Sequence, residues 1–293
     1  MQAWEEYWTS NDSNTPVFSD GTGNSREEIN LFWREAVSCL PSNAAIGDIA
    51  CGAGAVFDTI PDINRFTLVA HDGSSAARKH LRQKYNAASI LSNKDLSEVT
   101  SPAVDMLMSQ FGIEYLAEEE QGNAFSLLKK GGSFIALVHS KDGYIYGKYK
   151  TENRQLRFIH DNLLCESIYR LFVKGINGYA FVMKEFNQLW NNCADTPDNF
   201  IGGAQALYNG SYQILSRCTN YQPNDVKDWL LGIEQQLKTA TVNTQQIIDV
   251  AMTREQVIAM CMRNKINTDL EIEPLFIKSQ TYPISWSVKG KKC

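Results

Sequence analysis

The stretch Asp48-Ile49-Ala50-Cys51-Gly52-Ala53-Gly54 decides the fold, and Asp72 follows Gly54 after eighteen residues. This order predicts a strand, a glycine turn, a helix, a second strand and then an acid. Small residues at Ala50, Gly52 and Gly54 let the backbone approach a ligand, and a following helix offers free N–H groups. The stretch therefore predicts a site for a nucleoside-containing ligand at the edge of a parallel sheet.

Short apolar runs alternate with amphipathic segments from residue 44 to residue 139, which predicts an α/β unit with a parallel sheet. Lys129-Lys130-Gly131-Gly132 predicts the end of a helix and a glycine turn into the next strand. The expected strands are Ala45 to Ala50, Phe66 to His71, Ala88 to Ser92, Val104 to Ser109 and Ser133 to His139.

The pattern changes after His139, where apolar residues recur at helical spacing. A helical insertion, acting as a lid or cap, is expected over residues 140–250. A further helix is expected from Thr253, because Thr253 and Gln256 have the spacing of a capping box. Two strand-like runs, Leu270 to Lys278 and Ile284 to Lys289, predict a terminal antiparallel pair. We therefore predict a doubly wound, mostly parallel seven-stranded sheet formed by residues 44–139 and 251–293.

Residues 1–43 are expected to form an N-terminal flap, with a turn-prone middle from Ser10 to Ser25, and a helix from about Arg26 to Leu40. Arg34 can pair with a ligand carboxylate or serve as a solvated helix charge. Four aromatic residues can close over a ligand or simply pack a helix, and both interpretations stay open: Trp4, Tyr7, Trp8 and Trp33.

The composition, with 43% hydrophobic and 21% charged residues, is that of an ordinary soluble globular protein. No apolar run approaches the roughly 18 residues of a membrane span, and the N-terminus lacks a signal-peptide pattern, so a cytoplasmic location without membrane partners is expected. The net charge of -5 argues against loose binding to nucleic acid. The seven cysteines form no Cys-x-x-Cys pair, so we expect reduced thiols and no metal site.

The glycine turn differs from that of a dinucleotide dehydrogenase. The pattern Gly-x-Gly-x-x-Gly places its third glycine where this chain has Phe57. Asp72, at the end of the second expected strand, can accept both hydroxyls of a ribose. Asp48 can accept a hydrogen bond from a loop N–H or from a ligand amine.

At this point five ordered blocks resemble the class I S-adenosylmethionine-dependent methyltransferases. Asp48 to Gly54 is similar to the first motif of that family, with Ala50 in place of a glycine, and Leu68 to Ser74 is similar to the ribose-binding second motif. Lys94-Asp95-Leu96 stands where the family contacts adenine. Residues 104–111 resemble the motif of the fourth strand, and residues 127–134 resemble the turn into the fifth.

The resemblance implies a Rossmann-like fold and S-adenosylmethionine as the cofactor, with S-adenosylhomocysteine as its product. In this family, an insertion such as residues 140–250 commonly forms a lid over the substrate. The implied cofactor contacts are Asp48, Ala50, Cys51, Gly52, Gly54, Asp72, Gly73, Asp95, Leu96, Ser109, Gln110 and Phe111.

Methyl transfer needs an aligned nucleophile, and it needs a base only where that nucleophile carries a proton. His139 is the candidate base, because it follows the fifth strand at the carboxyl edge of the sheet. Tyr144 and Tyr146 are further catalytic candidates, and a packing role is the alternative for all three. Cys51 is expected to pack as a small residue rather than act as a nucleophile.

We expect a methyltransferase that acts on an O or N nucleophile of a small or medium-sized acceptor. A nucleic-acid acceptor is not expected, because residues 109–112 lack the Asn/Asp-Pro-Pro-Tyr of amino-methylating DNA enzymes. One alternative is a macromolecular acceptor, such as a protein, glycan or lipid-linked molecule, docked on the helical insertion. The other is a protein that binds the cofactor without transferring the methyl group.

Overall fold

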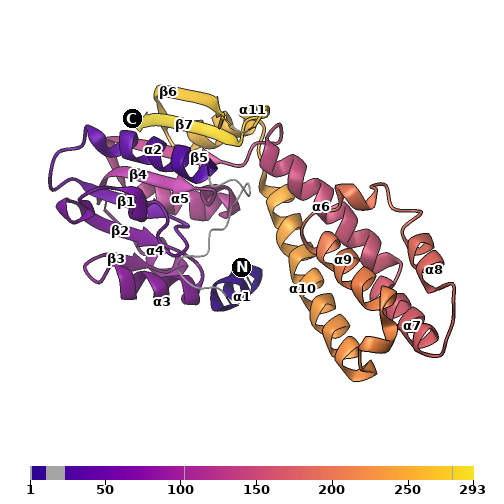
Figure 1. Ribbon diagram of the computed structural model, residues 1–293. Coiled ribbons are helices and arrows are strands. Elements are labelled where there is room, and N and C mark those ends of the chain that lie inside the picture. Colours follow the sequence, from indigo (N-terminus) through magenta and orange to yellow (C-terminus); the bar gives the residue numbers. More distant parts are fainter. Residues whose placement is uncertain (1, 11–23, 102, 279) are drawn as a thin grey trace. The chain divides into compact units, whose positions relative to one another are not determined.

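The computed structural model describes residues 2–10, 24–101, 103–278 and 280–293 (Figure 1). The chain forms two compact units, of which the first comprises residues 1–147 and 250–293 and the second residues 148–249. Most of the predicted turn-prone segment from Ser10 to Ser25 lies outside the described residues.

The first unit is built on a seven-stranded sheet in the order β3-β2-β1-β4-β5-β7-β6. Its strands are β1 (Ala45–Ile49), β2 (Thr67–His71), β3 (Ser89–Leu91), β4 (Val104–Gln110), β5 (Leu128–Val138), β6 (Ile266–Leu275) and β7 (Ser285–Lys292). Neighbouring strands from β3 to β5 are parallel, whereas β7 pairs antiparallel with both β5 and β6. This topology confirms the predicted sheet with its antiparallel C-terminal strand pair.

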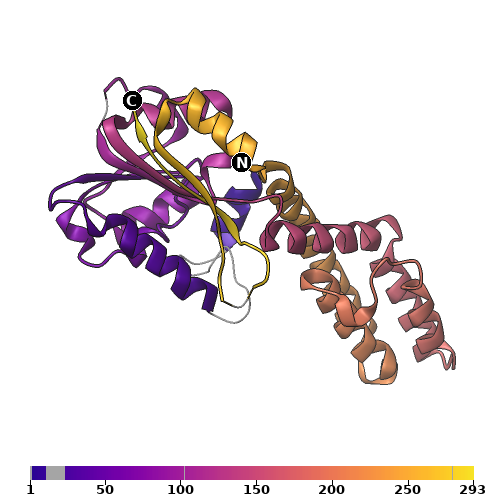
Figure 2. The ribbon, with the colours of Figure 1, turned by 90° about the horizontal axis from the view of Figure 1, so that it is seen from above.

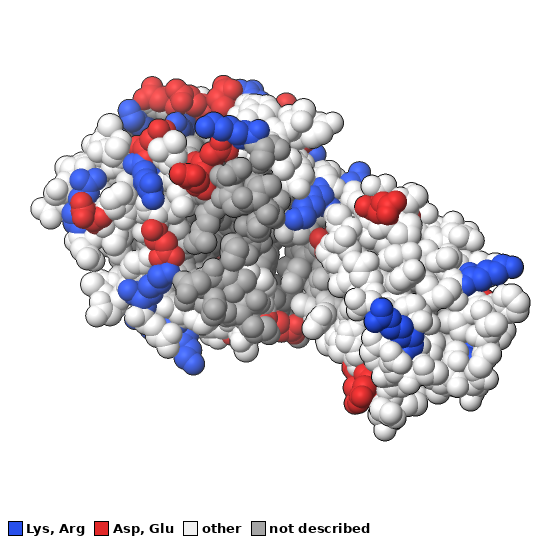
Figure 3. All heavy atoms as spheres, in the orientation of Figure 1, with Lys and Arg blue, Asp and Glu red and all other residues white. Residues whose placement is uncertain are grey.

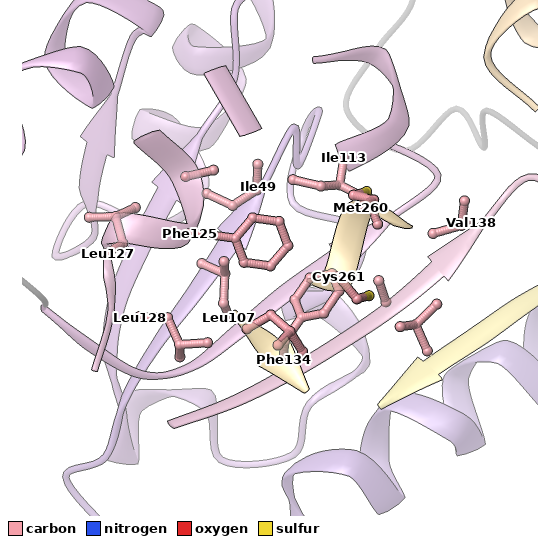
Figure 4. Packing of buried hydrophobic residues seen from close by; sticks show 14 of the residues in the cluster. Ile49, Leu107, Ile113, Phe125, Leu127, Leu128, Phe134, Val138, Met260 and Cys261 are labelled. Atoms are coloured by element: carbon pink, nitrogen blue, oxygen red, sulfur yellow. The ribbon is translucent and has the colours of Figure 1, made fainter. Parts of the chain in front are cut away.

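Helices cover both faces of the sheet. On one face, α4 (Asn93–Ser97), α5 (Glu118–Ser126) and α11 (Arg254–Arg263) share a buried apolar cluster with the strands (Figure 4). Within it, the rings of Phe125 and Phe134 meet edge to face, with centroids 4.7 Å apart. Figure 2 shows α2 (Asn24–Ser38) on the opposite side of the sheet from α11. The sheet is therefore doubly wound.

Local hydrogen bonds fix where two of these helices begin. Ser74 precedes α3 (Ser75–Lys84), and its side chain accepts a hydrogen bond from Ala77 N. Thr253 and Gln256 form the predicted capping box at the start of α11. Each cap satisfies N–H groups that the first turn of a helix otherwise leaves without partners.

The prediction of a helix directly after the glycine turn is wrong. Two short 3-10 helices, η1 (Phe57–Thr59) and η2 (Ile63–Arg65), stand in its place. Only six residues separate Gly54 from Pro61, and a proline disfavours the helical conformation in the residue before it. Ile60 is accordingly extended, with φ -88° and ψ 115°.

The glycine turn predicted between a helix and the fifth strand is also wrong. Helix α5 ends at Ser126, and Lys129 to Gly132 already belong to β5. The pairing of β5 with β4 shifts register between Val104 and Met106, so the glycines lie in a bulge of the strand.

The second unit, residues 148–249, lies within residues 140–250, the segment predicted to form a helical insertion. Its helices are α6 (Tyr144–Asp161), α7 (Leu164–Ile176), α8 (Val182–Leu189), α9 (Gly202–Ser216) and α10 (Pro223–Val250). They enclose an apolar core of their own. On the face of this unit that Figure 3 shows, Lys and Arg side chains lie apart from one another and are interspersed with acidic ones. None of the helices in the described ranges is long and apolar enough to cross a membrane.

Candidate active site

The glycine turn follows β1 at the carboxyl edge of the sheet. Ala50, Gly52 and Gly54 have positive φ angles of 51°, 56° and 88°. Gly54 N donates to Cys51 O over 2.9 Å and closes the turn. Because L-residues rarely adopt this left-handed conformation, the backbone explains why small residues occupy the turn.

Ala50 is the residue at which the sequence departs from the glycine of the first motif. An L-residue in the left-handed region costs roughly 1–2 kcal/mol. Its methyl group faces Gly112, where an added Cβ would lie 2.8 Å from the Cβ of Ala50 and 2.8 Å from its carbonyl oxygen. The turn accommodates Ala50 because residue 112 has no side chain.

Asp72 closes the glycine turn from the end of β2. Its Oδ2 accepts from Gly52 N and its Oδ1 accepts from Ser74 N, each over 2.8 Å. The Arg78 guanidinium donates to the carbonyl oxygens of Asp72 and Gly73. Burial raises the pKa of the Asp72 carboxyl, although both backbone N–H groups oppose this change. The acid of the second predicted motif is thus hydrogen-bonded directly to the glycine turn of the first.

Asp48 lies inside the sheet, one residue before the end of β1. Its side chain is fully buried, and neither carboxylate oxygen has a hydrogen-bond partner among the residues that the structure describes. Burial and, secondly, the charge of Asp72 raise the pKa of Asp48 well above its usual value. A buried carboxylate without a partner is costly, so this position suits a cation or donor brought by a ligand.

Cys51 is a buried residue of the glycine turn. Burial, followed by the charges of Asp48 and Asp72, raises the pKa of the Cys51 thiol well above its usual value. The thiolate is the nucleophilic form of cysteine, so this environment disfavours a nucleophilic role. The Cys51 side chain packs as a small residue in the turn.

The three residues predicted at the end of β4 are placed in different ways. The Ser109 hydroxyl donates to Ile49 O and accepts from Ile113 N, so it ties β4 to β1. Gln110 Oε1 accepts from Trp33 Nε1 over 2.6 Å. Phe111 has a φ of 52°, and its ring lies 4.6 Å from the imidazole of His139.

Asp95 and Leu96 lie in the first turn of α4. Asp95 Oδ2 accepts from both the backbone N and the hydroxyl of Ser92, forming a capping box. The side chain of Leu96 is buried in the core of the sheet. Asp95 is exposed. Of the two predicted adenine contacts, Asp95 has an exposed side chain and Leu96 has a buried one.

His139 forms a buried pair with Glu114, which comes from η3 (Ile113–Tyr115) after β4. His139 Nδ1 lies 2.6 Å from Glu114 Oε1, and the backbone N of His139 donates to the same oxygen over 2.9 Å. A carboxylate acceptor at this distance places the ring proton on Nδ1. The Nε2 atom has no hydrogen-bond partner in the described part of the chain.

Tyr144 and Tyr146 lie in the first turn of α6. Tyr144 N donates to Pro283 O, and both side chains are half-buried. The rings of Phe111 and Tyr115 lie against the imidazole of His139. The catalytic roles of Tyr144 and Tyr146 stay predictions.

The N-terminal helix α1 (Gln2–Ser10) packs against the glycine turn. The indole of Trp8 is buried and lies so close to Gly52 that a Cβ added there would overlap it. Trp4 meets Tyr115 edge to face at 5.5 Å, and Tyr115 in turn meets His139 at 6.0 Å. Aromatic residues of α1 thus line the same edge as the predicted motifs.

The Glu5 carboxylate holds α1 in this place. It accepts from Ser75 N over 2.8 Å, from the Ser75 hydroxyl over 2.5 Å and from Ala76 N over 3.2 Å. These N–H groups open α3, where a negative charge is favourable. Arg34, in contrast, donates to the carbonyl oxygen of Thr59 in η1.

Sequence reasoning missed Glu114 and Gly112. Both follow β4, whose carboxyl end lies beside the end of β5 in a parallel pair. An acid just after one strand and a histidine just after its neighbour is the signal that could have found the pair. Gly112 becomes meaningful only through its contact with Ala50.

No protein-family model matches the chain, and no curated protein matches it. Solved structures similar to it include S-adenosylmethionine-dependent methyltransferases. One from Thermotoga maritima, described as a possible histamine N-methyltransferase, shares 10% identity at a TM-score of 0.48, covering 100% of this chain and 99% of that chain.

Two further solved structures are similar to the chain. A possible exported protein from Bordetella parapertussis shares 11% identity at a TM-score of 0.45, covering 99% of this chain and 78% of that chain. Phosphoethanolamine N-methyltransferase 1 of Haemonchus contortus, in complex with phosphoethanolamine and S-adenosylhomocysteine, shares 16% identity at a TM-score of 0.36. That match covers 47% of this chain and 31% of the other.

Proposed function

We propose that the chain binds S-adenosylmethionine at the carboxyl edge of β1, β2 and β4 and transfers its methyl group to an O or N nucleophile of a small or medium-sized acceptor. The observation that carries this proposal is Asp48, a fully buried carboxylate whose oxygens have no partner in the described ranges. An ammonium group brought by the ligand would offset the cost of burying this charge.

The neighbouring residues fit the rest of the cofactor. Each oxygen of Asp72 accepts one backbone N–H, which leaves acceptor capacity for two ribose hydroxyls. Gly52 and Gly54 keep side chains out of the turn between the two acids. Asp95 adds an exposed carboxylate at the start of α4. The residues present therefore suit S-adenosylmethionine, with Asp48 for its ammonium group, Asp72 for its ribose and Asp95 for its adenine.

The protein's chemical contribution is to position the acceptor and remove its proton. When bound, S-adenosylmethionine supplies an electrophilic methyl carbon. With its proton on Nδ1, His139 can take a proton from an acceptor hydroxyl or ammonium at Nε2. The buried Glu114 carboxylate then stabilises the imidazolium and holds the ring in one orientation. Glu114 acts as a positioning residue and His139 as the base.

Methyl transfer to a panel of small hydroxyl and amine compounds tests this function. His139→Ala should lower turnover by roughly 10²- to 10⁴-fold and leave cofactor affinity nearly unchanged. Glu114→Gln keeps the shape but not the charge, so it should lower kcat and shift its pH profile. Transfer to protein or glycan acceptors alone would favour the macromolecular alternative, and unchanged turnover in His139→Ala would remove the base. The lid role of residues 140–250 stays a prediction.

A further inference from the structure

Three cationic side chains follow one another along α6 in the helical unit. Lys150, Arg154 and Arg157 are four and three residues apart, so they project from the same side of the helix. They line a groove of about 480 Å³ to which α10 contributes Gln245 and Ile248. All of the groove's residues belong to the second unit.

Arg157 is held in place by neutral groups. Its Nε donates to Asn153 Oδ1 over 2.8 Å, and its Nη2 donates to Gln245 Oε1 over 2.9 Å. Asn153 is itself buried and donates to Thr241 O and Thr244 Oγ1 on α10. Residues 148–249, all of which the structure describes, supply no ion-pair partner for Arg157. The guanidinium is thus oriented without being neutralised.

Arg154, one turn earlier, differs in this respect. Its Nη2 donates to both carboxylate oxygens of Asp195 over 2.8 and 2.9 Å. That contact neutralises most of its charge. An arginine fixed by amides keeps its remaining N–H groups and its full charge for another anion, whereas one fixed by a carboxylate does not.

The charges lining the groove favour an anion. Lys150, Arg154 and Arg157 contribute three positive charges, whereas Asp161 and Asp195, the partner of Arg154, contribute two negative charges, a formal sum of +1. This local excess occurs in a chain whose net charge is -5. Phe158 and Ile248 add apolar surface to the same groove.

We propose that this groove binds a small molecule carrying a phosphate monoester, with two phosphate oxygens on Arg157 and the apolar part of the ligand along Phe158 and Ile248. A guanidinium fork matches two oxygens of a phosphate, and a phosphate monoester is anionic at neutral pH. The proposal is independent of methyl transfer, because it concerns another set of residues.

Calorimetric titration of the full chain with phenyl phosphate, without cofactor or acceptor, tests the proposal. Saturable binding is expected, and Arg157→Gln should weaken it by about tenfold or more. Arg170→Gln is the matched control, since Arg170 is an exposed arginine of α7 paired with Glu166, and it should leave the affinity unchanged. Inorganic phosphate should bind more weakly than phenyl phosphate, because it lacks the apolar part.

Two results would overturn the site. One is no saturable heat with millimolar phenyl phosphate, and the other is equal affinity in wild type and Arg157→Gln. Arg157→Lys serves as a second variant should Arg157→Gln fail to fold, because it keeps the charge and loses the fork. It is expected to bind more weakly than wild type, and unchanged affinity would contradict the bidentate contact.

Discussion

Replacing Asp48 by Asn should stabilise the ligand-free protein at neutral pH, although it alters the proposed cofactor site. The side chain is fully buried without a partner among the described residues, and burial raises its pKa. An unsatisfied buried polar group costs about 1–3 kcal/mol, and a charged one costs more. The variant still buries an amide, so the gain comes from the charge alone and should be about 1–2 kcal/mol.

The sign of the pH dependence follows from the raised pKa. A carboxyl group with a higher pKa in the folded state stabilises the protein fully below its unfolded pKa of about 3.9. That contribution is lost as the pH rises through the folded value. The advantage of Asp48→Asn over the wild type should therefore grow from acidic to neutral pH. Urea unfolding at several pH values between about 4.5 and 8 measures this difference.

Asp105→Asn is a matched control with the opposite sign. Asp105 lies on β4, where a hydrogen bond from Lys129 and a second from Ala45 N lower its pKa. Its contribution is present above the unfolded pKa and is lost as the pH falls through the folded value. The penalty of Asp105→Asn should shrink towards acidic pH. If Asp48→Asn is less stable than the wild type at pH 7, or if its advantage does not grow with pH, the Asp48 carboxylate has a partner and this reasoning is refuted.

Three further predictions concern α1 and the helical unit. Gly52→Ala adds a Cβ 3.0 Å from Trp8 Cη2 at a φ of 56°, so it should displace α1 and shift tryptophan fluorescence to the red. The free energy of unfolding in urea should fall by about 2 kcal/mol or more. A second substitution, Trp8→Ala, should recover part of that loss. Gly202→Ala, at a φ of 53°, places its Cβ 2.6 Å from Glu152 Cδ and should lower the free energy of unfolding by more than about 2 kcal/mol. Gly178→Ala, at a φ of 86° with nothing within 4 Å, should lower it by only about 1–2 kcal/mol. Equal losses in the two variants would contradict the clash. The hydroxyl of Ser75 lowers the pKa of Glu5, so docking of α1 should weaken as the pH falls through the folded value. Glu5→Gln should show weak docking at every pH. The rate of proteolysis within α1 measures docking, and a rate that changes with neither pH nor Glu5→Gln would contradict the Glu5 contact.

β1, β2 and β4 could be predicted because most of their residues are buried, so these strands appear as short, mainly apolar runs. β4, expected from Val104 to Ser109, extends from Val104 to Gln110. The bulge in β5 could not be found in this way. A glycine pair after two lysines has the pattern of a turn, and only the register with β4 shows that Gly131 and Gly132 lie within the strand.

Side-chain partnerships at the site were harder to predict than its position. The acid at the end of β2 could be placed by spacing alone, and Asp72 lies against Gly52 as that spacing implies. The pairing of His139 with Glu114 depends on where two neighbouring strands end, which no single motif records. Likewise, Trp8 reaches Gly52 only through the packing of α1, so composition left both interpretations of the N-terminal aromatic residues open.

The proposed cofactor site at the edge formed by β1 and β2 depends on Asp48 and Asp72. Calorimetric titration with S-adenosylhomocysteine measures binding at this site. The wild type should bind, Asp72→Ala should weaken binding by about 1.5–3 kcal/mol through loss of the carboxylate, and Asp105→Asn, on β4, should bind as the wild type does. No measurable binding to the wild type, or equal affinity in Asp72→Ala, would contradict this cofactor site.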